Sequence, residues 1–521
     1  MDFSLVPSDA IQPLFYAEVD ASKAGGGVPA RPTLIMGQRI TDYGTATDNV
    51  PVRISGGAQG PALFGHGSQL ARMLEFYYKA DPFAEVWACP SADPGGVKAN
   101  RDIVFVGTST AAGTLHLYIG GRYLAIPVPT SSNATAVGQL VEDYLGANEA
   151  AAVAGVTLGY PSPFPVTASN AVGTVTLTAR NAGLVGNTID FRVNYLGAAA
   201  GQSLPAGITL GTTLPIYLTN GTLGPADLAT SILALADERY SYIVWPWADG
   251  TSLDTLQVET ADSTAGRWGP IRKLYGTAFT ADNAAYATLA DVGLATAKNN
   301  DPHCTALGID ACPTPADELA AVYAGACAVS LRNDRARPLN TLPLPGVLAP
   351  AAASRFNYAE RDVLLKLGIT TPIYSSDGTV RIQRAVSCRT LNAYGSSDFA
   401  YRDITTAETL DQCLTEMESL ITSKYGRVKL VNDADSIFPG SAVATPSMVK
   451  ADLVAQYRGW ERSAYVEDTD TFANLLVVER NLTDPNRLDV LWQPDLANGL
   501  HIFAVLAAFR LQYSAAEVAG E

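Results

Sequence analysis

The sequence lacks the short motifs that most catalytic and nucleotide-binding sites require. It contains no Gly-Lys dipeptide, and hence no P-loop, and it has no GxGxxG, GxSxG or HExxH pattern. The four histidines, His66, His116, His303 and His501, lie far apart in the chain. His303 adjoins Cys304, but this spacing fits no common zinc pattern and indicates ordinary packing. The sequence therefore predicts no catalytic residue, no metal ligand and no cofactor, so we do not expect an enzyme.

Positive charge is also scarce. The formal net charge is −16 and no run of Lys and Arg occurs, which argues against nucleic acid or an anionic membrane as a partner. No apolar stretch is long enough to span a bilayer, and the start MDFSLVPSD has an acid where a signal peptide needs a base. The six cysteines form no CxxC pair, as expected of buried thiols in a reducing compartment. We therefore expect folding in the cytoplasm and no direct membrane insertion.

Apolar residues are plentiful. They make up 47% of the 521 residues, whereas charged residues make up 17%. This composition can form several large cores, and a chain of this length has about three or four domains as a prior. Much of the surface must then consist of Ala, Thr, Ser and Gly, which suits broad protein–protein contact, although an Ala-rich composition alone explains it equally well.

The end of the chain is its most informative part. Three apolar runs, LLVVERN at 475–481, TDPNRLDVLWQPDL at 483–496 and NGLHIFAVLAAFRLQY at 498–513, are separated by turn residues. The last run is apolar on both faces if it is extended, so it needs cover on both faces and pairing of its backbone. It is either the central strand of its own domain or an arm that enters another subunit. A helix is possible, but the aromatic and β-branched residues favour a strand.

The rest of the chain predicts an α+β/α/β multidomain protein. Alternating strands and helices predict an α/β core domain of largely parallel or mixed sheet in two pieces, 31–100 and 216–384. A stretch rich in Gly, Thr, Ser and Val predicts a mainly β domain inserted at 101–215. Residues 385–497 predict a C-terminal α+β domain, followed by a terminal strand or arm at 498–521. Residues 1–30, with a possible strand at 14–19 and a Gly-rich joint, predict a detachable N-terminal arm.

Local signals support individual elements. Helices are expected at 68–79, 133–147, 225–240, 282–298, from 314 and from 357, and at 406–426 and 445–462. The clearest cues are Ser68, the Thr314-Pro315 pair, the Asn357–Glu360 capping box and the Thr445-Pro446 pair. Hairpins are expected at 114–128 around Gly120-Gly121, at 164–180, and at 369–388 around Asp377-Gly378 with a type I′ turn.

The ordered set of segments resembles the contractile tail sheath proteins of Mu-like bacteriophages. The similarity covers nearly the full length, and the inserted stretch is its least distinctive part. The segments that carry it are PLFYAEVDASKAGGG with RPTLIMGQ, VPVRI with ALFGHGSQLARMLEFYYKADPFAEVWACP, RWGPIRKLYGTAFT, LNTLPLPGVLAP, SSDGTVRIQRAVS, TPSMVKADLVAQYRGWE and DPNRLDVLWQPDLANGLHIFAVLAAFRLQY.

The resemblance implies a structural function. Subunits of that family form a helical homopolymer around a tail tube, and contraction drives the tube through the host envelope; the partners are further copies, the tube protein, the baseplate and the tail terminator. The family's terminal arms add strands to the C-terminal domain of neighbours. The implied exchange residues here are Leu14, Phe15, Tyr16, Val19, Leu500, Ile502, Phe503, Val505, Phe509 and Leu511. The inner, tube-facing surface is expected on the C-terminal helices, with candidates Glu416, Lys424, Arg427, Lys429, Lys450 and Arg458.

Two alternatives stay open at the level of the sequence. One is a receptor-binding protein whose β-rich insertion binds a glycan, and the other is a cytosolic hydrolase with an unfamiliar site. Tubular polymers would favour the sheath, glycan retention without polymers the adhesin, and substrate turnover the enzyme.

Overall fold

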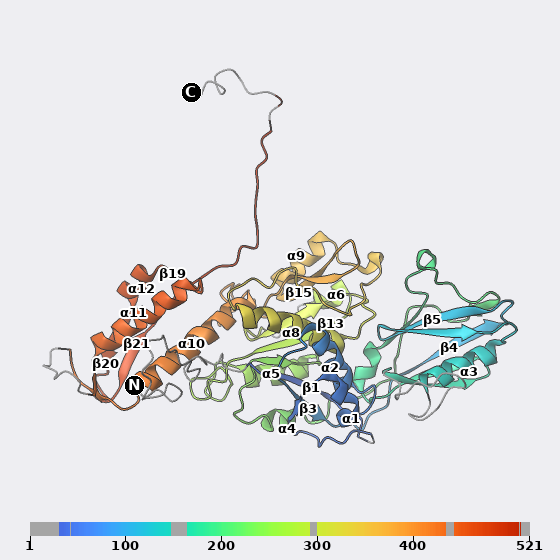
Figure 1. The fold of residues 1–521 in the computed structure, drawn as a ribbon, viewed down its shortest axis with the longest axis horizontal. Helices are drawn as coiled ribbons and strands as arrows, with labels where there is room; N and C mark the ends of the chain where they lie inside the picture. The colour runs from blue at the N-terminus through green and yellow to red at the C-terminus, as the bar shows by residue number, and fades with distance from the viewer. Residues whose placement is uncertain are drawn as a thin grey trace, which may run out of the picture.

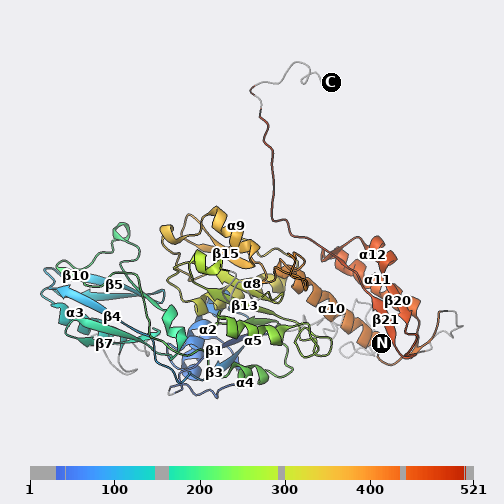
Figure 2. The same ribbon diagram turned by 180° about the vertical axis from the view of Figure 1, so that it is seen from behind.

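The computed structural model describes residues 31–41, 43–146, 164–291, 300–433, 442–509 and 511. The molecule is elongated, with a β-rich part at one end, a helical part at the other and a central α/β layer structure between them (Figures 1 and 2). This is a mixed α/β multidomain fold with one largely parallel sheet and several antiparallel sheets. The N-terminal strand expected at 14–19 lies outside the described residues.

An eight-stranded sheet forms the centre, in the order β16-β15-β14-β13-β12-β1-β3-β2. Its inner strands are parallel, while β2 and β16 run antiparallel to their neighbours at the two edges. The strands are β1 (Thr33–Gln38), β2 (Val52–Ile54), β3 (Val86–Ser91), β12 (Tyr242–Val244), β13 (Thr277–Asp282), β14 (Cys304–Gly308), β15 (Ile369–Tyr374) and β16 (Val380–Arg384).

Helices cover both faces of this sheet, which explains why its strands are nearly continuous apolar runs. On one face Ile35 and Phe279 pack with α2 and α8, and on the other Leu34 and Trp245 pack with α4 and α5. The helices of the central part are α1 (Gly60–Phe64), α2 (Gln69–Ala80), α4 (Leu228–Leu233), α5 (Gly250–Thr260), α6 (Tyr286–Leu289), α8 (Ala316–Asn333) and α9 (Tyr358–Lys366).

The β-rich end is built from residues between the two halves of the central part. Two four-stranded antiparallel sheets, β10-β4-β8-β7 and β11-β9-β5-β6, share one apolar core with helix α3. Their elements are β4 (Asn100–Gly107), β5 (Gly113–Ile119), β6 (Arg122–Val128), α3 (Ala134–Leu145), β7 (Val166–Ala171), β8 (Thr174–Ala179), β9 (Asp190–Val193), β10 (Ile208–Leu210) and β11 (Ile216–Tyr217).

A buried charge cluster joins the β-rich end to the centre. Arg122, at the start of β6, donates to Glu318 of α8 at 2.5 Å and to Glu75 of α2 at 2.8 Å. Glu318 is fully buried and also accepts from Arg72 at 2.5 Å, while Arg72 reaches Asp317 at 2.9 Å. Burial raises the pKa of Glu318, although both arginines oppose that rise. Such a cluster fixes the β-rich part on the core, because separating it leaves a buried carboxylate short of a partner.

The helical end contains α10 (Ile404–Tyr425), α11 (Pro446–Arg462) and α12 (Thr469–Leu475) with three two-stranded sheets. The first part of α10 packs on the central sheet through Ile404, whereas Met417, Leu420 and Ile421 pack in the core of the helical end. Helix α10 therefore belongs to both parts. The strands are β17 (Lys429–Leu430), β18 (Val443–Ala444), β19 (Val466–Glu467), β20 (Val477–Arg480), β21 (Leu488–Leu491) and β22 (Asp495–Leu496).

Several local expectations are confirmed. Ser68 accepts a hydrogen bond from the Ala71 amide at the start of α2, and Thr445 does the same for Met448 at the start of α11. The capping box of Asn357 and Glu360 is present at α9. The strands β5 and β6 form a hairpin around Gly120 and Gly121, both with positive φ, as do β7 and β8 over the second expected hairpin.

Other expectations are wrong. The helix expected at 225–240 is only α4, which starts after Asp227 rather than at Pro225. Thr314 does not cap α8, because its hydroxyl accepts from the Leu348 amide and Pro315 occupies the cap position. Of the helix expected at 282–298, α6 is the described part, and 292–299 lie outside the described residues.

The hairpin of β15 and β16 forms, but its turn is not type I′. A type I′ turn needs positive φ at both central residues, whereas only Gly378 has it, at 83°. The Gly378 amide donates to the Ser375 carbonyl and the Ser375 amide to the Thr379 carbonyl, both at 3.0 Å. This is a type I turn followed by a glycine bulge, the pattern of a three-residue loop.

Candidate assembly interfaces

The terminal run 498–509 forms neither a central strand nor a helix in the subunit. It leaves the helical end after β22 as an extended segment that projects away from the body (Figure 1). Of the two alternatives left open by the sequence, a central strand of its own domain is not formed, because no described strand lies beside the segment to pair its backbone. Its apolar side chains are 69 to 98% exposed, namely Leu500, Ile502, Phe503, Val505, Leu506, Phe509 and Leu511.

The root of this segment is attached to the body. The His501 side chain is only 14% exposed, although its neighbours Leu500 and Ile502 point outward. Its Nδ1 lies 3.0 Å from Asn340 Nδ2, and its Nε2 lies 3.4 Å from Asp403 Oδ1. Burial lowers the pKa of His501, with Asp403 opposing and Arg384 adding to the effect. A neutral imidazole can accept from the Asn340 amide at Nδ1 while its Nε2 faces the Asp403 carboxylate.

The ribbon of β20 and β21 has open edges. It is two-stranded within the described residues, with Val477 opposite Leu491 and Arg480 opposite Leu488. The Asn481 amide donates to the Arg487 carbonyl at 2.9 Å. In an antiparallel ribbon only every second residue pair exchanges backbone hydrogen bonds, so from this pair the hydrogen-bonded residues of β20 are Glu479 and Val477. The amides of Val478 and Val490 consequently face outward on the two edges. Open edges of this kind can accept a further strand.

The six tube-facing candidates do not form one patch. Glu416 and Lys450 are engaged within the subunit, because Trp460 Nε1 donates to Glu416 at 2.6 Å and Lys450 Nζ donates to the Leu476 carbonyl at 2.7 Å. Arg458 is exposed on α11 and lines a small cavity with Asp468 and Asp470.

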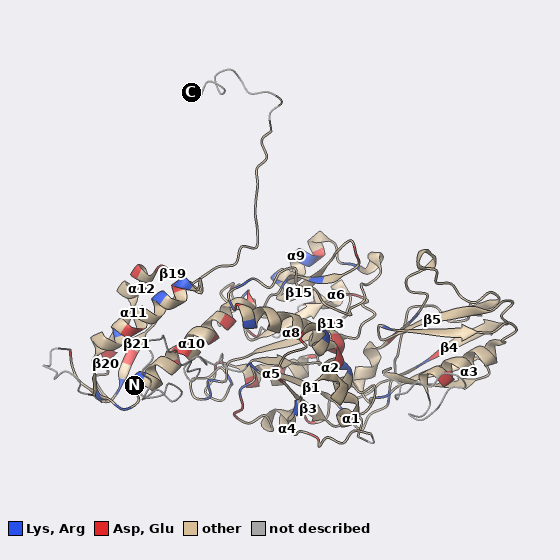
Figure 3. Cartoon of the chain, viewed as in Figure 1, with Lys and Arg blue, Asp and Glu red and all other residues tan. Residues whose placement is uncertain are grey.

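The other three candidates gather at the end of α10. Arg427 and Lys429 are exposed, and Lys424 Nζ lies 2.5 Å from Asp452 of α11. Burial acts against the ionised form of Asp452, but hydrogen bonds from Lys424 and Tyr425 lower its pKa overall. Charged residues of both signs occur along α10 and α11, whereas the β-rich end carries few (Figure 3).

The N-terminal candidates Leu14, Phe15, Tyr16 and Val19 lie outside the described residues. The described chain begins at Arg31, whose guanidinium is buried against Glu408 and Asp411 of α10. Sequence reasoning missed this contact, as it missed the partners of His501. Neither contact has a local signal, because the partners are distant in the chain.

The structure gives His303 a packing role. Its ring stacks on Trp268 with centroids 3.9 Å apart, and its Nε2 lies 2.8 Å from Asp262 Oδ1. A search of the described residues finds no cluster of three or more His, Cys, Asp or Glu side chains placed to bind a metal ion. Among the same residues, none of the helices has the length and apolarity that crossing a membrane requires.

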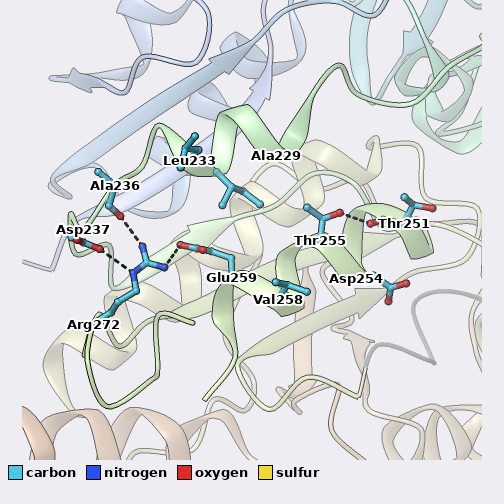
Figure 4. Close-up of a pocket in the computed structure, with 11 residues that line it drawn as sticks. Ala229, Leu233, Ala236, Asp237, Thr251, Asp254, Thr255, Val258, Glu259 and Arg272 are labelled. Atoms are coloured by element: carbon cyan, nitrogen blue, oxygen red, sulfur yellow. Dashed lines mark hydrogen bonds and ion pairs between the residues drawn. The ribbon is translucent and has the colours of Figure 1, made fainter. Parts of the chain in front are cut away.

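A groove of about 830 Å³ lies between α4 and α5. Leu233 and Val258 line it, and Arg272 closes one end by donating to Asp237 at 2.9 Å and to Glu259 at 3.0 Å (Figure 4). Its charged groups at that end are thus engaged with one another. The groove has the character of a surface depression with apolar walls.

Comparison with known proteins identifies the family. Residues 221–388 match the phage tail sheath protein central domain, and residues 396–510 match the phage tail sheath C-terminal domain. The Mu-like prophage FluMu tail sheath protein of Haemophilus influenzae is 32% identical over 514 residues, which cover 98% of this chain and all of that protein.

Solved structures of sheath proteins also align. The sheath tail protein from Desulfitobacterium hafniense has a TM-score of 0.45 at 12% identity, over 94% of this chain and 100% of that one. The helical sheath of the anti-feeding prophage in the contracted state has a TM-score of 0.43 at 11% identity, over 96% and 99% of the two chains.

The family assignment rests on the full-length sequence match and the two domain matches. The resemblance read from the sequence is thereby confirmed, and the glycan-binding and hydrolase alternatives fall away. The chain belongs to the phage tail sheath family and is a structural subunit of a contractile tail, not an enzyme.

Proposed function

We propose that the subunit polymerises helically around a tail tube and that exchange of its terminal arms holds the polymer together. The observation that carries the proposal is the extended segment 498–509, whose apolar side chains are exposed. Burying such a segment against a neighbour removes a large apolar area from water and pairs its backbone. Strand exchange also keeps neighbours connected while rigid domains rotate during contraction.

The ribbon of β20 and β21 is the proposed acceptor. It combines outward-facing amides at Val478 and Val490 with exposed apolar side chains at Val477 and Leu491. An incoming strand gains backbone hydrogen bonds from the edge and apolar contact from these side chains. The same ribbon is proposed to accept the N-terminal arm, so Tyr16→Pro, which removes one backbone donor, should shorten the polymers.

The decisive experiment alters the C-terminal arm. Deleting residues 498–521 should leave a folded subunit that no longer forms tubes in electron micrographs. A second variant, Phe503→Asp with Val505→Asp and Phe509→Asp, keeps the chain length and the root at His501. Because all three side chains are exposed in the subunit, its unfolding midpoint should stay unchanged while sedimentable polymer falls at least about tenfold. Normal tubes from both variants would refute arm exchange.

The acceptor can be tested separately. Val490→Pro removes an outward donor without removing a hydrogen bond of the ribbon itself, so polymer should be lost while the subunit stays folded. Val490→Thr, which retains both the amide and the β-branched shape, is the matched control. Full assembly of the proline variant would exclude the β21 edge as the acceptor.

The β-rich end is proposed to face outward and to be dispensable for polymerisation. It stands at the end of the molecule opposite the helical part and is tied to the core through Arg122. Replacing residues 101–215 by a Gly-Ser linker removes that partner, so the replacement should be combined with Glu318→Gln. Retained tube formation supports an accessory role, whereas loss of assembly by a folded core refutes it.

The inner surface is proposed to come from the helical end, with the tail tube as partner and the baseplate and tail terminator at the two ends of the polymer. Polar, partly hydrated contacts suit a surface that must hold the tube and then release it, because each is weak and exchanges easily with water. The cluster of Lys424, Arg427 and Lys429 is the best placed of the six candidates, since Arg427 and Lys429 are exposed. Many identical interfaces then multiply a small difference between two packings into the work of driving the tube through the host envelope.

A further inference from the structure

The described N-terminal end of the chain is fixed to helix α10. Arg31 Nη1 donates to Glu408 Oε2 at 3.0 Å and to the Tyr242 hydroxyl at 2.9 Å, and its Nη2 donates to Asp411 Oδ2 at 2.6 Å. The Arg31 side chain is 4% exposed. Burial alone would lower the pKa of Arg31, but the two carboxylates outweigh it and raise the pKa.

Other side chains complete this site. Asp411 also accepts from Arg335 at 3.0 Å and from Arg239, and Glu408 accepts from Thr277 Oγ1 at 2.7 Å. Three arginines thus share two carboxylates, and all of these side chains except that of Arg239 are nearly completely buried. Removing Arg31 alone would leave Glu408 with a neutral hydroxyl as its remaining side-chain partner among these contacts. The chain at residue 31 is therefore held firmly against α10.

The C-terminal arm is fixed to the same end of α10. Asp403 occupies the N-cap position of α10, yet its side chain makes no capping hydrogen bond. It accepts instead from Arg384 at 2.8 and 2.7 Å and lies beside His501. Asn340 contacts the other nitrogen of the His501 ring. A residue type that usually caps the helix is here directed to the root of the arm.

Asp403, Glu408 and Asp411 lie within the first turns of one helix. At 1.5 Å per residue the three span about 12 Å along the axis. Beyond them α10 continues into the helical end, where Trp460 of α11 bonds to Glu416. Arg31, His501 and the helical end are thus connected through one helix.

We propose that the first turns of α10 are a common anchor for both terminal arms, with Arg31 fixing the root of the N-terminal arm and His501 that of the C-terminal arm. This α10 anchor (Asp403, Glu408 and Asp411) sets where the arms leave the subunit relative to the ribbon that accepts them. The role of the anchor in assembly rests on the proposed arm exchange, whereas the contacts that form the anchor belong to the single subunit. Arg31 and His501 are positioning residues, since neither touches the neighbour in this scheme.

Distance measurements between spin labels on unpolymerised full-length subunits test the anchor. The six native cysteines are all buried, so cysteines introduced at exposed Ser419 on α10 and at Ile502 can be labelled selectively. His501→Ala should broaden the distance distribution between them about twofold, because the root is then free to move. Asn340→Ala, which removes a partner rather than the histidine, should broaden it in the same direction. His116→Ala, at a histidine of the β-rich end, is the matched control and should change nothing.

The N-terminal root is tested with labels at Val28→Cys and Ser419→Cys. Arg31→Met combined with Glu408→Gln removes that ion pair without leaving Glu408 as an unpaired buried carboxylate, and Asp411 keeps Arg335 and Arg239, so the subunit should still fold. This double variant should broaden the 28–419 distance and leave the 419–502 distance unchanged. Broadening of both distances would mean general loosening of α10, and broadening of neither would mean no anchor; either result overturns the proposal.

Electron micrographs of the same variants separate the anchor from the proposed function. Broadened distances together with short or misshapen tubes support both. Broadened distances with normal tubes would retain the anchor and refute its role in arm exchange. Unchanged distances with normal arm-dependent assembly would refute the anchor and retain arm exchange.

Discussion

The central sheet and the C-terminal arm are made of the same kinds of residues, but the side chains of the sheet are buried and those of the arm are exposed. In β1, Leu34 and Ile35 are fully buried, because helices of the same chain cover both faces of the sheet. In the arm, Phe503 and Leu506 are 82% and 95% exposed. Both segments read as strands that need cover on two faces.

The difference lies in where the cover comes from. The central strands obtain it from helices that follow them in the chain, so the subunit satisfies them alone. None of the described helices and strands covers the arm, so its apolar surface is exposed in the subunit. An exposed apolar segment of this kind is the type of surface that other chains bind, whereas a covered one contributes to the fold. The predictions below test this contrast.

The largest effect is expected from charges buried in the centre. Arg72→Met leaves the fully buried Glu318 and the buried Asp317 with one fewer cation, which should cost about 3 to 5 kcal/mol of unfolding free energy. Lys424→Met at the partly exposed pair with Asp452 should cost about 0 to 1 kcal/mol. Chemical denaturation of both variants measures the two values. Equal losses would remove the contrast between the centre and the helical end.

Apolar truncation should separate folding from assembly. Leu34→Ala removes a fully buried side chain and should cost about 2 to 5 kcal/mol of unfolding free energy. Leu506→Ala should leave the unfolding free energy unchanged and reduce the length of assembled tubes, because this side chain is exposed until a neighbour covers it. Denaturation and sizing of polymers by sedimentation provide the two readouts. A large loss of subunit stability from Leu506→Ala would show that the arm already contributes to the fold.

A smaller effect is expected at the end of α10. Reversing Lys424, Arg427 and Lys429 to Glu should impair co-assembly with tail tubes while tube-free polymers still form. Subunit stability should change by about 1 kcal/mol or less, because each side chain is largely exposed. Pelleting with purified tubes measures the first effect. As a matched control, Lys366→Glu alters an exposed lysine of α9 in the central part and should leave co-assembly intact. Full co-assembly of the triple variant would exclude the cluster of Lys424, Arg427 and Lys429 from the tube contact.

The smallest effect is a pH dependence at the root of the arm. The pKa of His501 in the subunit is below its ordinary value of 6.5. The anchored, neutral form is therefore fully favoured above that value, and the contact weakens as pH falls through it towards the lower pKa of the anchored state. The 419–502 label distance should accordingly broaden on acidification, and His501→Ala should abolish the change. A distance that narrows at low pH would mean that protonation by way of Asp403 strengthens the contact instead.

Local signals in the sequence predicted many of the elements correctly. Ser68, Thr445 and the Asn357–Glu360 pair mark helix starts because a cap is a contact between residues three apart. The glycine turn between β5 and β6 is local in the same sense. By contrast, α5 and β13 were not predicted. Helix α5 buries only a few of its side chains, and the six residues of β13, TAFTAD, are too few to show a clear pattern.

The candidate site could be predicted only in part. The apolar pattern indicated that residues from Leu500 to Leu511 need cover. It did not indicate that, among the residues of this run that the structure describes, His501 is the one turned inward. The charged candidates were chosen as residues of two helices. Their separation into an exposed group with Arg427 and an engaged group with Glu416 depends on how α10 and α11 pack.

The sequence by itself determined the strands and helices with strong local signals, the absence of a recognisable catalytic motif, and an apolar run from Leu500 to Leu511 that needs cover. Each of these depends on residue type and on contacts within a few positions. Tertiary structure decided that α10 joins two parts of the molecule and that Arg31 meets Glu408 across 377 positions of the chain. No periodicity encodes such a contact, because it exists only once the central sheet has formed and has placed the start of β1 beside α10.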